Sequence, residues 1–466
     1  MRGEEICWAD AGEIVEAVRG GKLTATQVVT AILKRIDKYD GVLRAFVTVC
    51  ADEALAAARA ADSRRPKGEV LGPLDGVPVS IKDIILTKGV RTTAGSKLQA
   101  DYVPDVDAIV VERLKAAGAI VIGKTTTPEY CHKTVTTSPL TGETRNPWDL
   151  DRTPGGSSGG SAVALAAGMG PISIGTDGGG SIRLPAALCG IVGFKPTAGV
   201  VPQWPTIPGW DLLGHTGPMA RSVSDIRLVM NCISGPDTRD PDSLIRPHDE
   251  TDKPLRVAWT RSLDQLEPET DVAEALEEVV AAARDCVGHV DEVRLNWSDP
   301  DQQFRVIVLS DLHSAFGHRL ETEDREIMDP TLIQMLEFAR SLSGSDLARA
   351  LRWRRSFSAR ILTWFRDFDI LIVPTAPVSA FPLGMIGPRV IAGKKTSPHA
   401  WFGWTWPFNA TGQPALSLPF IRDNRLPVGV QIVGRPWADS IVIAFAEKLE
   451  KRLRSNRRPE LAALAS

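Results

Sequence analysis

The sequence predicts an α/β protein in which a mostly parallel sheet is covered by helices, and three observations support this. The chain has 466 residues, enough for two or three domains or for one large α/β domain. Its 43% hydrophobic and 24% charged residues are typical of a globular protein. Between residues 72 and 199, short apolar runs alternate with helical segments and Gly-rich turns, a pattern that favours parallel strands joined by helices.

The first part of the chain begins with helices and continues into the predicted sheet. Residues 10–62 place apolar side chains three or four positions apart and end in an Ala-rich run, so we expect helices there. Strands are expected at residues 77–85, 119–123 and 172–177. A helix is expected at 107–118, between the first two strands.

A charged, helical segment at residues 236–355 separates this part from a return to the sheet. Its clearest amphipathic helices are at 271–286 and 330–340. The elements expected after it are a strand at 368–374, a strand at 428–434 and a closing helix at 441–454. The closing helix carries cations at its carboxyl end, where the helix dipole favours them.

Charge and cysteine content exclude several classes of function. A net charge of −3 gives no reason to expect nucleic acid or a membrane as partner. The six cysteines are scattered without a CxxC pair, and no cluster of metal-ligating residues is seen, so we expect no metal and no cofactor. Because the N-terminus carries acids rather than an apolar signal core, we expect a soluble, cytoplasmic chain.

Two short motifs match known signatures without their structural context. Gly118–Thr125 satisfies the P-loop pattern, but its four central residues form an apolar strand rather than an open phosphate loop. The GGSSGG run at Gly155–Gly160 fits GxSxG, but a loop precedes it where an α/β-hydrolase needs a strand. A triad of that kind would use His399. We keep an α/β-hydrolase-type esterase as an alternative.

Three segments carry the residues best suited to chemistry. Lys82 lies in an apolar strand, Ser157 and Ser158 lie in one Gly-Ser turn, and Ser181 lies in a second one. Both turns stand between apolar strands and Ala-rich helices, where a flexible linker is not expected. Their glycines therefore indicate tight turns and close approach of the backbone to a ligand.

These segments resemble the amidase signature family, whose members are serine hydrolases with a Ser–Ser–Lys triad. The stretch Pro154–Thr197, PGGSSGGSAVALAAGMGPISIGTDGGGSIRLPAALCGIVGFKPT, is close to the family signature nearly throughout. The resemblance continues over residues 8–235 and 368–447, in segments such as FDILIVPTAP and FNATGQPALSLP.

The resemblance also implies how the chain is organised. We expect a single large domain, residues 1–466, with a central, mostly parallel mixed sheet covered by helices on both faces. Residues 8–235 would form the signature core, 236–355 a variable helical insertion, and 356–466 the return to the core.

The family's roles carry over to four residues. Ser181 would be the nucleophile that forms an acyl-enzyme. Ser157, which follows a cis peptide in the family, would pass the proton of Ser181 to Lys82. Lys82 must be neutral to accept it, so burial has to lower its pKa from about 10.4. Ser158 would support Lys82 by a hydrogen bond.

The turn around the nucleophile would stabilise the oxyanion. The expected donors are the backbone N–H groups of Gly178, Gly179, Gly180 and Ser181. Gly178 stands where the family usually has a larger residue, a departure that would loosen or widen the loop. Asp177 and Arg183 flank the nucleophile and are expected to hold the loop in place.

Aromatic clusters in the variable segments suggest a hydrophobic or aryl substrate. The candidate pocket residues are Tyr130, Cys131, Trp204, Trp210, Trp401 and Trp404. Cys131 stands where relatives often have glycine and would narrow the pocket. For each cluster, ordinary core packing is the alternative.

We therefore expect an amidase (EC 3.5.1.-) that hydrolyses C–N bonds of linear, hydrophobic or aryl small-molecule amides. Carbamates (urethanes) and esters are further expected substrates, because their carbonyl groups undergo the same tetrahedral chemistry. The protein would act as a monomer or homodimer. A second hypothesis is the A subunit of a glutamine-dependent tRNA amidotransferase, which would need partner subunits and a polar pocket.

Overall fold

An eleven-stranded sheet runs through the molecule and positions the candidate site near its middle. The computed structural model describes residues 1, 3–243, 253–264, 266–295, 297, 301–422, 425–453 and 457–461. In chain order, the strands of the sheet are β1 (Phe46–Val49), β2 (Pro78–Lys82), β3 (Ile120–Thr125), β6 (Ile172–Thr176), β7 (Val192–Lys195), β8 (Thr216–Ala220), β9 (Val257–Trp259), β10 (Val290–Glu292), β11 (Ile370–Pro374), β14 (Ala415–Phe420) and β15 (Val428–Gly434).

The spatial order of the strands is β1-β3-β2-β6-β8-β7-β14-β15-β11-β9-β10. The α/β fold with a mixed sheet is confirmed, but the expected predominance of parallel pairing is not. Between the described strands, four pairings are parallel, those of β2 with β3 and β6 and those of β9 with β10 and β11. The other six are antiparallel, because β8, β7, β14 and β15 alternate in direction across the middle of the sheet.

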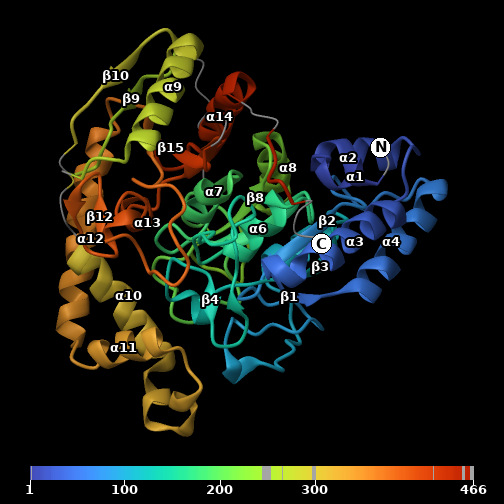
Figure 1. The fold of residues 1–466 in the computed structure, drawn as a ribbon, viewed down its shortest axis with the longest axis horizontal. Coiled ribbons are helices and arrows are strands. Elements are labelled where there is room, and N and C mark those ends of the chain that lie inside the picture. Colours follow the sequence, from blue (N-terminus) through green and yellow to red (C-terminus); the bar gives the residue numbers. More distant parts are fainter. Residues whose placement is uncertain are drawn as a thin grey trace.

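Helices flank the sheet in two groups. α6 and α7 pack on each other and on the central strands, whereas α8, α9 and α14 form a second group against the sheet (Figure 1). The helices are α1 (Glu4–Trp8), α2 (Ala11–Arg19), α3 (Ala25–Leu43), α4 (Ala51–Arg64), α5 (Ile109–Ala116), α6 (Gly159–Ala166), α7 (Arg183–Cys189), α8 (Val223–Ile233), α9 (Thr270–Val287), α10 (Asp301–Phe316), α11 (Pro330–Ala339), α12 (Gly344–Trp364), α13 (Pro407–Ala410) and α14 (Asp439–Leu453). Two small hairpins pair β4 (Thr137–Ser138) with β5 (Gly142–Glu143) and β12 (Val390–Ile391) with β13 (Lys394–Lys395).

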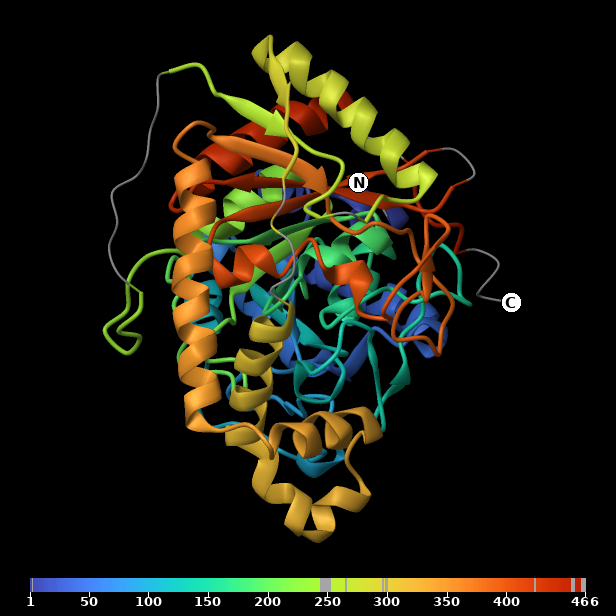
Figure 2. The same ribbon diagram turned by 90° about the vertical axis from the view of Figure 1, so that its left-hand side faces the viewer.

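The segment at 236–355 is not purely a helical insertion, because it supplies β9 and β10 to the sheet and α9 to the helices against it. The rest of the segment begins a separate group of helices at one end of the molecule. α10 packs along α12 and also contacts α11, which lies across their ends (Figure 2). Parts of the segment, residues 244–252 and 298–300 among them, lie outside the described residues. Across the part of the chain that the structure describes, no helix has the length and apolar character needed to cross a membrane.

Candidate active site

Lys82 is the last residue of β2 and is completely buried. β2 and β6 are parallel neighbours, with Ile81 opposite Ile174, so their carboxyl ends lie side by side. This register brings Lys82 next to Thr176, the last residue of β6. The Lys82 Nζ lies 2.7 Å from Thr176 Oγ1 and 3.4 Å from the Thr176 carbonyl oxygen. It also lies 2.7 Å from Ser157 Oγ.

The pKa of Lys82 is lowered because burial removes water from around its ammonium group, an effect that nearby Cys131 and Asp177 only partly oppose. Asp83, the next residue, has its own set of contacts. Its carboxyl group accepts hydrogen bonds from the backbone N–H and the hydroxyl of Thr93, a residue that is not among the described hydrogen-bond partners of Lys82. The environment of Lys82 therefore favours the neutral amine that a base requires.

Ser157 and Ser158 lie in the turn immediately before α6. The Gly156–Ser157 peptide is cis, as the resemblance implied. The expected hydrogen bond from Ser158 to Lys82 is not among the described contacts. Instead, the Ser158 hydroxyl donates to the Thr176 carbonyl at 3.2 Å and accepts from the Thr176 N–H at 3.3 Å. Ser158 therefore anchors the end of β6, and the Thr176 side chain is the one that contacts Lys82.

Ser181 lies in the turn between β6 and α7, and its carbonyl accepts a hydrogen bond from the Ser158 N–H at 3.1 Å. The two Gly-Ser turns are therefore joined directly. Ser181 lines a cavity of about 310 Å³, whereas Lys82 and Ser157 are fully buried and do not line it. Gly180 has a φ of 131°, and an added Cβ there would lie 2.3 Å from Thr405 Oγ1, so this position requires glycine.

A buried ion pair holds the turn. Asp177 and Arg183 are both inaccessible to solvent, and the guanidinium donates to both carboxylate oxygens at 2.9 Å. Arg183 also donates to Asn409 Oδ1 at 2.7 Å and to Gln431 Oε1 at 2.6 Å. Burial alone would raise the pKa of Asp177. The charge and hydrogen bonds of Arg183 outweigh this effect and hold the pKa well below its ordinary value. Both residues therefore lie where the sequence interpretation placed them, as supports of the loop.

The four backbone N–H groups expected in the oxyanion hole are not equivalent. The N–H of Gly180 donates to Asp177 Oδ1 at 2.7 Å, so it is committed to the loop, and the expectation for this residue is corrected. Among the described residues, the N–H groups of Gly178, Gly179 and Ser181 have no hydrogen-bond acceptor. These three N–H groups remain the candidates for the oxyanion role.

Two of the six predicted pocket residues line the same cavity as Ser181: Cys131 and Trp210. Tyr130 and Trp204 line a neighbouring cavity of about 250 Å³ instead. Gly178 does not widen the loop, because the Trp210 ring fills the space beside it.

Trp401 and Trp404 are fully buried core residues outside the cavity lining, so the pocket assignment for both is wrong. Their indole N–H groups are used within the core, the first donating to the Ile386 carbonyl at 3.0 Å and the second to Asp264 Oδ1 at 3.5 Å.

Sequence reasoning missed the residues that α10 and α11 contribute to the cavity. The apolar and polar lining residues from these two helices are Phe304, Arg305, Val308, Leu309, Thr331, Gln334, Met335 and Phe338. Of the two helices, α11 was expected from its amphipathic spacing and α10 was not. Nothing in the sequence indicates which face of either helix would meet Ser181. Thr176 was missed as well, although its place one residue before Asp177 in the signature could have drawn attention to it.

Comparison with known proteins decides the family. A family model described as Amidase matches residues 27–443. This chain belongs to the amidase family. The chain is 34% identical over 464 residues to an acylamidase of Rhodococcus erythropolis, covering 97% of this chain and 96% of that protein. It is 36% identical to the A subunit of the glutamyl-tRNA(Gln) amidotransferase of Chloroflexus aggregans, covering 96% and 97%. The solved structure of a bacterial aryl acylamidase of the amidase signature family matches with a TM-score of 0.87 and 28% identity, covering 96% of both chains.

Membership of the amidase family removes the α/β-hydrolase alternative. The residues directly before Ser157 form a loop, so the strand–turn–helix arrangement of a nucleophile elbow is absent there. The P-loop match is equally a coincidence. Lys124 lies in β3 and donates to the hydroxyls of Thr87 and Thr92 at 3.0 Å, so it is committed to the core and does not face a phosphate site.

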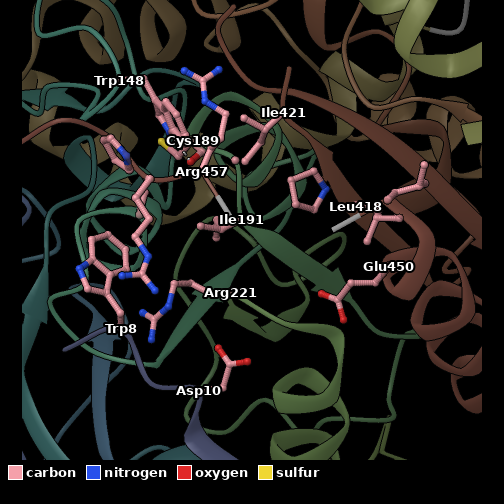
Figure 3. A pocket seen from close by; sticks show the side chains of 16 residues that line it. Trp8, Asp10, Trp148, Cys189, Ile191, Arg221, Leu418, Ile421, Glu450 and Arg457 are labelled. Carbon is pink, nitrogen blue, oxygen red and sulfur yellow. Dashed lines mark hydrogen bonds between the residues drawn. The ribbon is translucent and has the colours of Figure 1, made fainter. Parts of the chain in front are cut away.

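A further cavity of about 110 Å³ lies between the N-terminal helices and α14 (Figure 3). Neither Lys82, Ser157 nor Ser181 lines it, and Trp8, Arg221 and Glu450 are among the side chains that do. The Arg221 guanidinium donates to the carbonyl oxygens of Ala9 and Gly170, so it ties the N-terminus to the core. Within the described ranges, no group of three His, Cys, Asp or Glu side chains could hold a metal ion.

Proposed function

We propose that this amidase hydrolyses small-molecule amides with apolar or aryl substituents, through an acyl-enzyme on Ser181. The observation that carries the proposal is the buried contact of 2.7 Å between Lys82 Nζ and Ser157 Oγ, in a turn that is hydrogen-bonded to the turn of Ser181, which lines a mainly apolar cavity. An isolated serine hydroxyl is too weak an acid to attack an amide, so a base must accept its proton.

The proton path follows from the hydrogen bonds around Lys82. Neutral lysine has two N–H donors and one lone pair. Besides Ser157, its partners are the two oxygens of Thr176, at 2.7 and 3.4 Å, and the side chain of Cys131. With both donors directed to these groups, the lone pair faces the Ser157 hydroxyl. Ser157 then gives its proton to Lys82 as it accepts the proton of Ser181, and the Ser181 oxygen attacks the carbonyl carbon.

Collapse of the tetrahedral intermediate reverses the proton path. The negative oxygen is stabilised by the N–H groups of Gly178, Gly179 and Ser181, each worth about 10²–10³ in rate for a well-placed donor. The Lys82 ammonium returns a proton through Ser157 to the leaving nitrogen as the C–N bond breaks. Water then attacks the acyl-enzyme by the same relay, releasing the acid and restoring the Ser181 hydroxyl.

The cavity supports apolar substrates. Its apolar lining residues are Trp210, Phe304, Val308, Leu309, Met335, Phe338, Ile386 and Phe402. Such walls favour aryl or alkyl groups on the amide. Carbamates and esters present a similar carbonyl group and are included in the proposal.

A glutamine-dependent function is the second candidate, because the Chloroflexus aggregans amidotransferase chain is as similar to this chain as the acylamidase is. Gln334 and Thr331 give the cavity polar groups that could contact a carboxamide. The apolar walls argue against this candidate.

One experiment separates the two candidates. The purified chain, without partners, is incubated with a matched anilide, primary amide, carbamate and glutamine, and product release is measured. We expect turnover of the anilide or the carbamate with glutamine untouched, and loss of that turnover in Ser181→Ala and Lys82→Ala. Hydrolysis of glutamine only, or no turnover by the wild type until partner proteins are added, would favour the amidotransferase.

A further inference from the structure

The ring of Trp210 occupies the space that a side chain at position 178 would fill. A Cβ added to Gly178 would lie 2.2 Å from Trp210 Cε3 and 2.4 Å from Cζ3, and its third neighbour is also an atom of that ring. Gly178 does not have a positive φ, so its backbone would accept a side chain. The glycine is needed because of the indole and not because of the turn.

Trp210 is held in this position from two sides. Its indole N–H donates to the Tyr130 carbonyl at 2.9 Å, and its backbone N–H donates to the Ile207 carbonyl at 3.0 Å. The Tyr130 ring in turn stacks on Phe316 at the end of α10, with ring centroids 3.9 Å apart. The indole therefore forms a fixed wall of the cavity.

A second ring covers the next glycine of the same loop. A Cβ on Gly179 would lie 3.3 Å from Phe304 Cζ, so the Phe304 ring packs against this residue. The centroid of the Phe304 ring lies 4.9 Å from that of Trp406, which lies 5.8 Å from that of Phe357 on α12. Phe304 is thus part of an aromatic cluster that limits its movement.

We propose that Trp210 and Phe304 form an aromatic pair that binds a flat aryl group bonded directly to the scissile amide, at its carbonyl carbon or its nitrogen. Both rings line the Ser181 cavity, and both pack against glycines of the loop that carries Ser181. A group attached to the reacting carbonyl would therefore lie beside the two rings. Planar rings gain from stacked or edge contacts with indole and phenyl side chains, whereas flexible alkyl groups gain less.

This inference deepens the proposed function and rests on it, and a double-mutant cycle at positions 178 and 210 tests it. The measured quantities are kcat/KM for benzamide, for acetanilide and for N-ethylacetamide. Dividing the value for each of the two aryl amides by the value for N-ethylacetamide gives two ratios. We expect Trp210→Ala to lower the larger of the two ratios by about tenfold. Trp204→Ala is the matched control, since Trp204 lies in the neighbouring cavity, and it should leave the ratio unchanged.

The cycle also predicts a rescue. Gly178→Ala alone forces the new methyl group into the indole and should reduce kcat/KM for every substrate. In Gly178→Ala/Trp210→Ala the clash is gone, so activity on N-ethylacetamide should rise above that of Gly178→Ala, while the preference for aryl amides stays low. An unimpaired Gly178→Ala, an absence of rescue, or an unchanged ratio in Trp210→Ala would each overturn the aromatic pair.

A second readout keeps this test independent of the substrate class. The rates at which phenyl and butyl fluorophosphonates label Ser181 report the same contacts without turnover of an amide. If the wild type hydrolyses no amide, the proposed function fails. A phenyl-to-butyl labelling ratio that falls in Trp210→Ala and not in Trp204→Ala would still support the aromatic pair, and equal ratios in all three proteins would overturn it.

Discussion

At the scale of single residues, the proposed proton relay depends on the protonation state of Lys82. Its pKa lies below the ordinary value because its surroundings are dry. Below that pKa the amine is protonated and cannot accept a proton, so kcat/KM should rise with pH as Lys82 loses its proton. The rise should level off well before pH ~10, the region where an ordinary lysine titrates. A pH–rate profile of kcat/KM measures this, and a rise that continues through pH ~10 would contradict a depressed pKa.

The buried ion pair below the nucleophile gives a prediction for stability. In Arg183→Met, the carboxylate of Asp177 keeps its burial and loses its counter-charge, and such a loss typically costs about 3–5 kcal/mol. We expect urea denaturation at neutral pH to show a loss of this size together with loss of activity. Arg227→Met is the control, because the ion pair of Arg227 with Glu447 is partly exposed and should contribute little. Equal effects of the two substitutions would show that the buried pair has no special role.

Residues of the site differ in how far the sequence could predict them. Lys82, Ser157 and Ser181 belong to short motifs, and the structure brings their segments together. The oxyanion donors could be predicted only as a group, because the choice among four N–H groups depends on where the Asp177 carboxylate points. Phe304 carries no local signal, since a phenylalanine on an amphipathic helix is usually a core residue.

At the scale of secondary structure elements, α11 is fixed to the cavity through its first turn. Asp329 caps the helix by accepting the Thr331 N–H at 2.9 Å, and it also accepts a hydrogen bond from Lys133 at 2.6 Å. His132 Nε2 lies 2.7 Å from Thr331 Oγ1. These contacts join α11 to the loop that follows Cys131.

Asp329→Ala should therefore affect both stability and substrate binding. Loss of the cap costs about 0.5–2 kcal/mol, and movement of α11 should raise KM for large amides more than it lowers kcat. Ser343→Ala removes the cap of α12, and Ser343 does not line the Ser181 cavity. A similar loss of stability with unchanged KM is expected there. If both variants raise KM equally, the effect is not specific to α11.

Element prediction from the sequence succeeded where periodicity was strong. The helices at 271–286 and 330–340 and the strands at 77–85, 368–374 and 428–434 are present within a few residues. The strands that were not expected are β1, β7, β8, β9, β10 and β14. They are about as short as the predicted strands β2, β6 and β11, so length does not separate the two groups. The missed strands are defined by their neighbours in the sheet rather than by a pattern of their own.

At the scale of the whole molecule, the proposed chemistry is complete within one chain. The relay uses only side chains and backbone groups of β2, β6 and the two Gly-Ser turns. We expect dialysis against EDTA to leave anilide hydrolysis unchanged, and specific activity to be independent of added protein partners. Steady-state rates before and after dialysis measure this. Activity that is lost on chelation and regained with a divalent ion would contradict the proposed relay.

The central claim is that Ser181, and no neighbouring group, attacks the substrate. The most direct test is reaction with a fluorophosphonate, followed by cleavage before Asp177, which separates Ser181 from Ser157 and Ser158, and fragment-ion mass spectrometry of the labelled peptide. We predict one phosphonyl group on Ser181, no labelling in Ser181→Ala, and strongly slowed labelling in Lys82→Ala. A label on Ser157, Ser158 or Cys131, or labelling that persists in Ser181→Ala, would contradict the account.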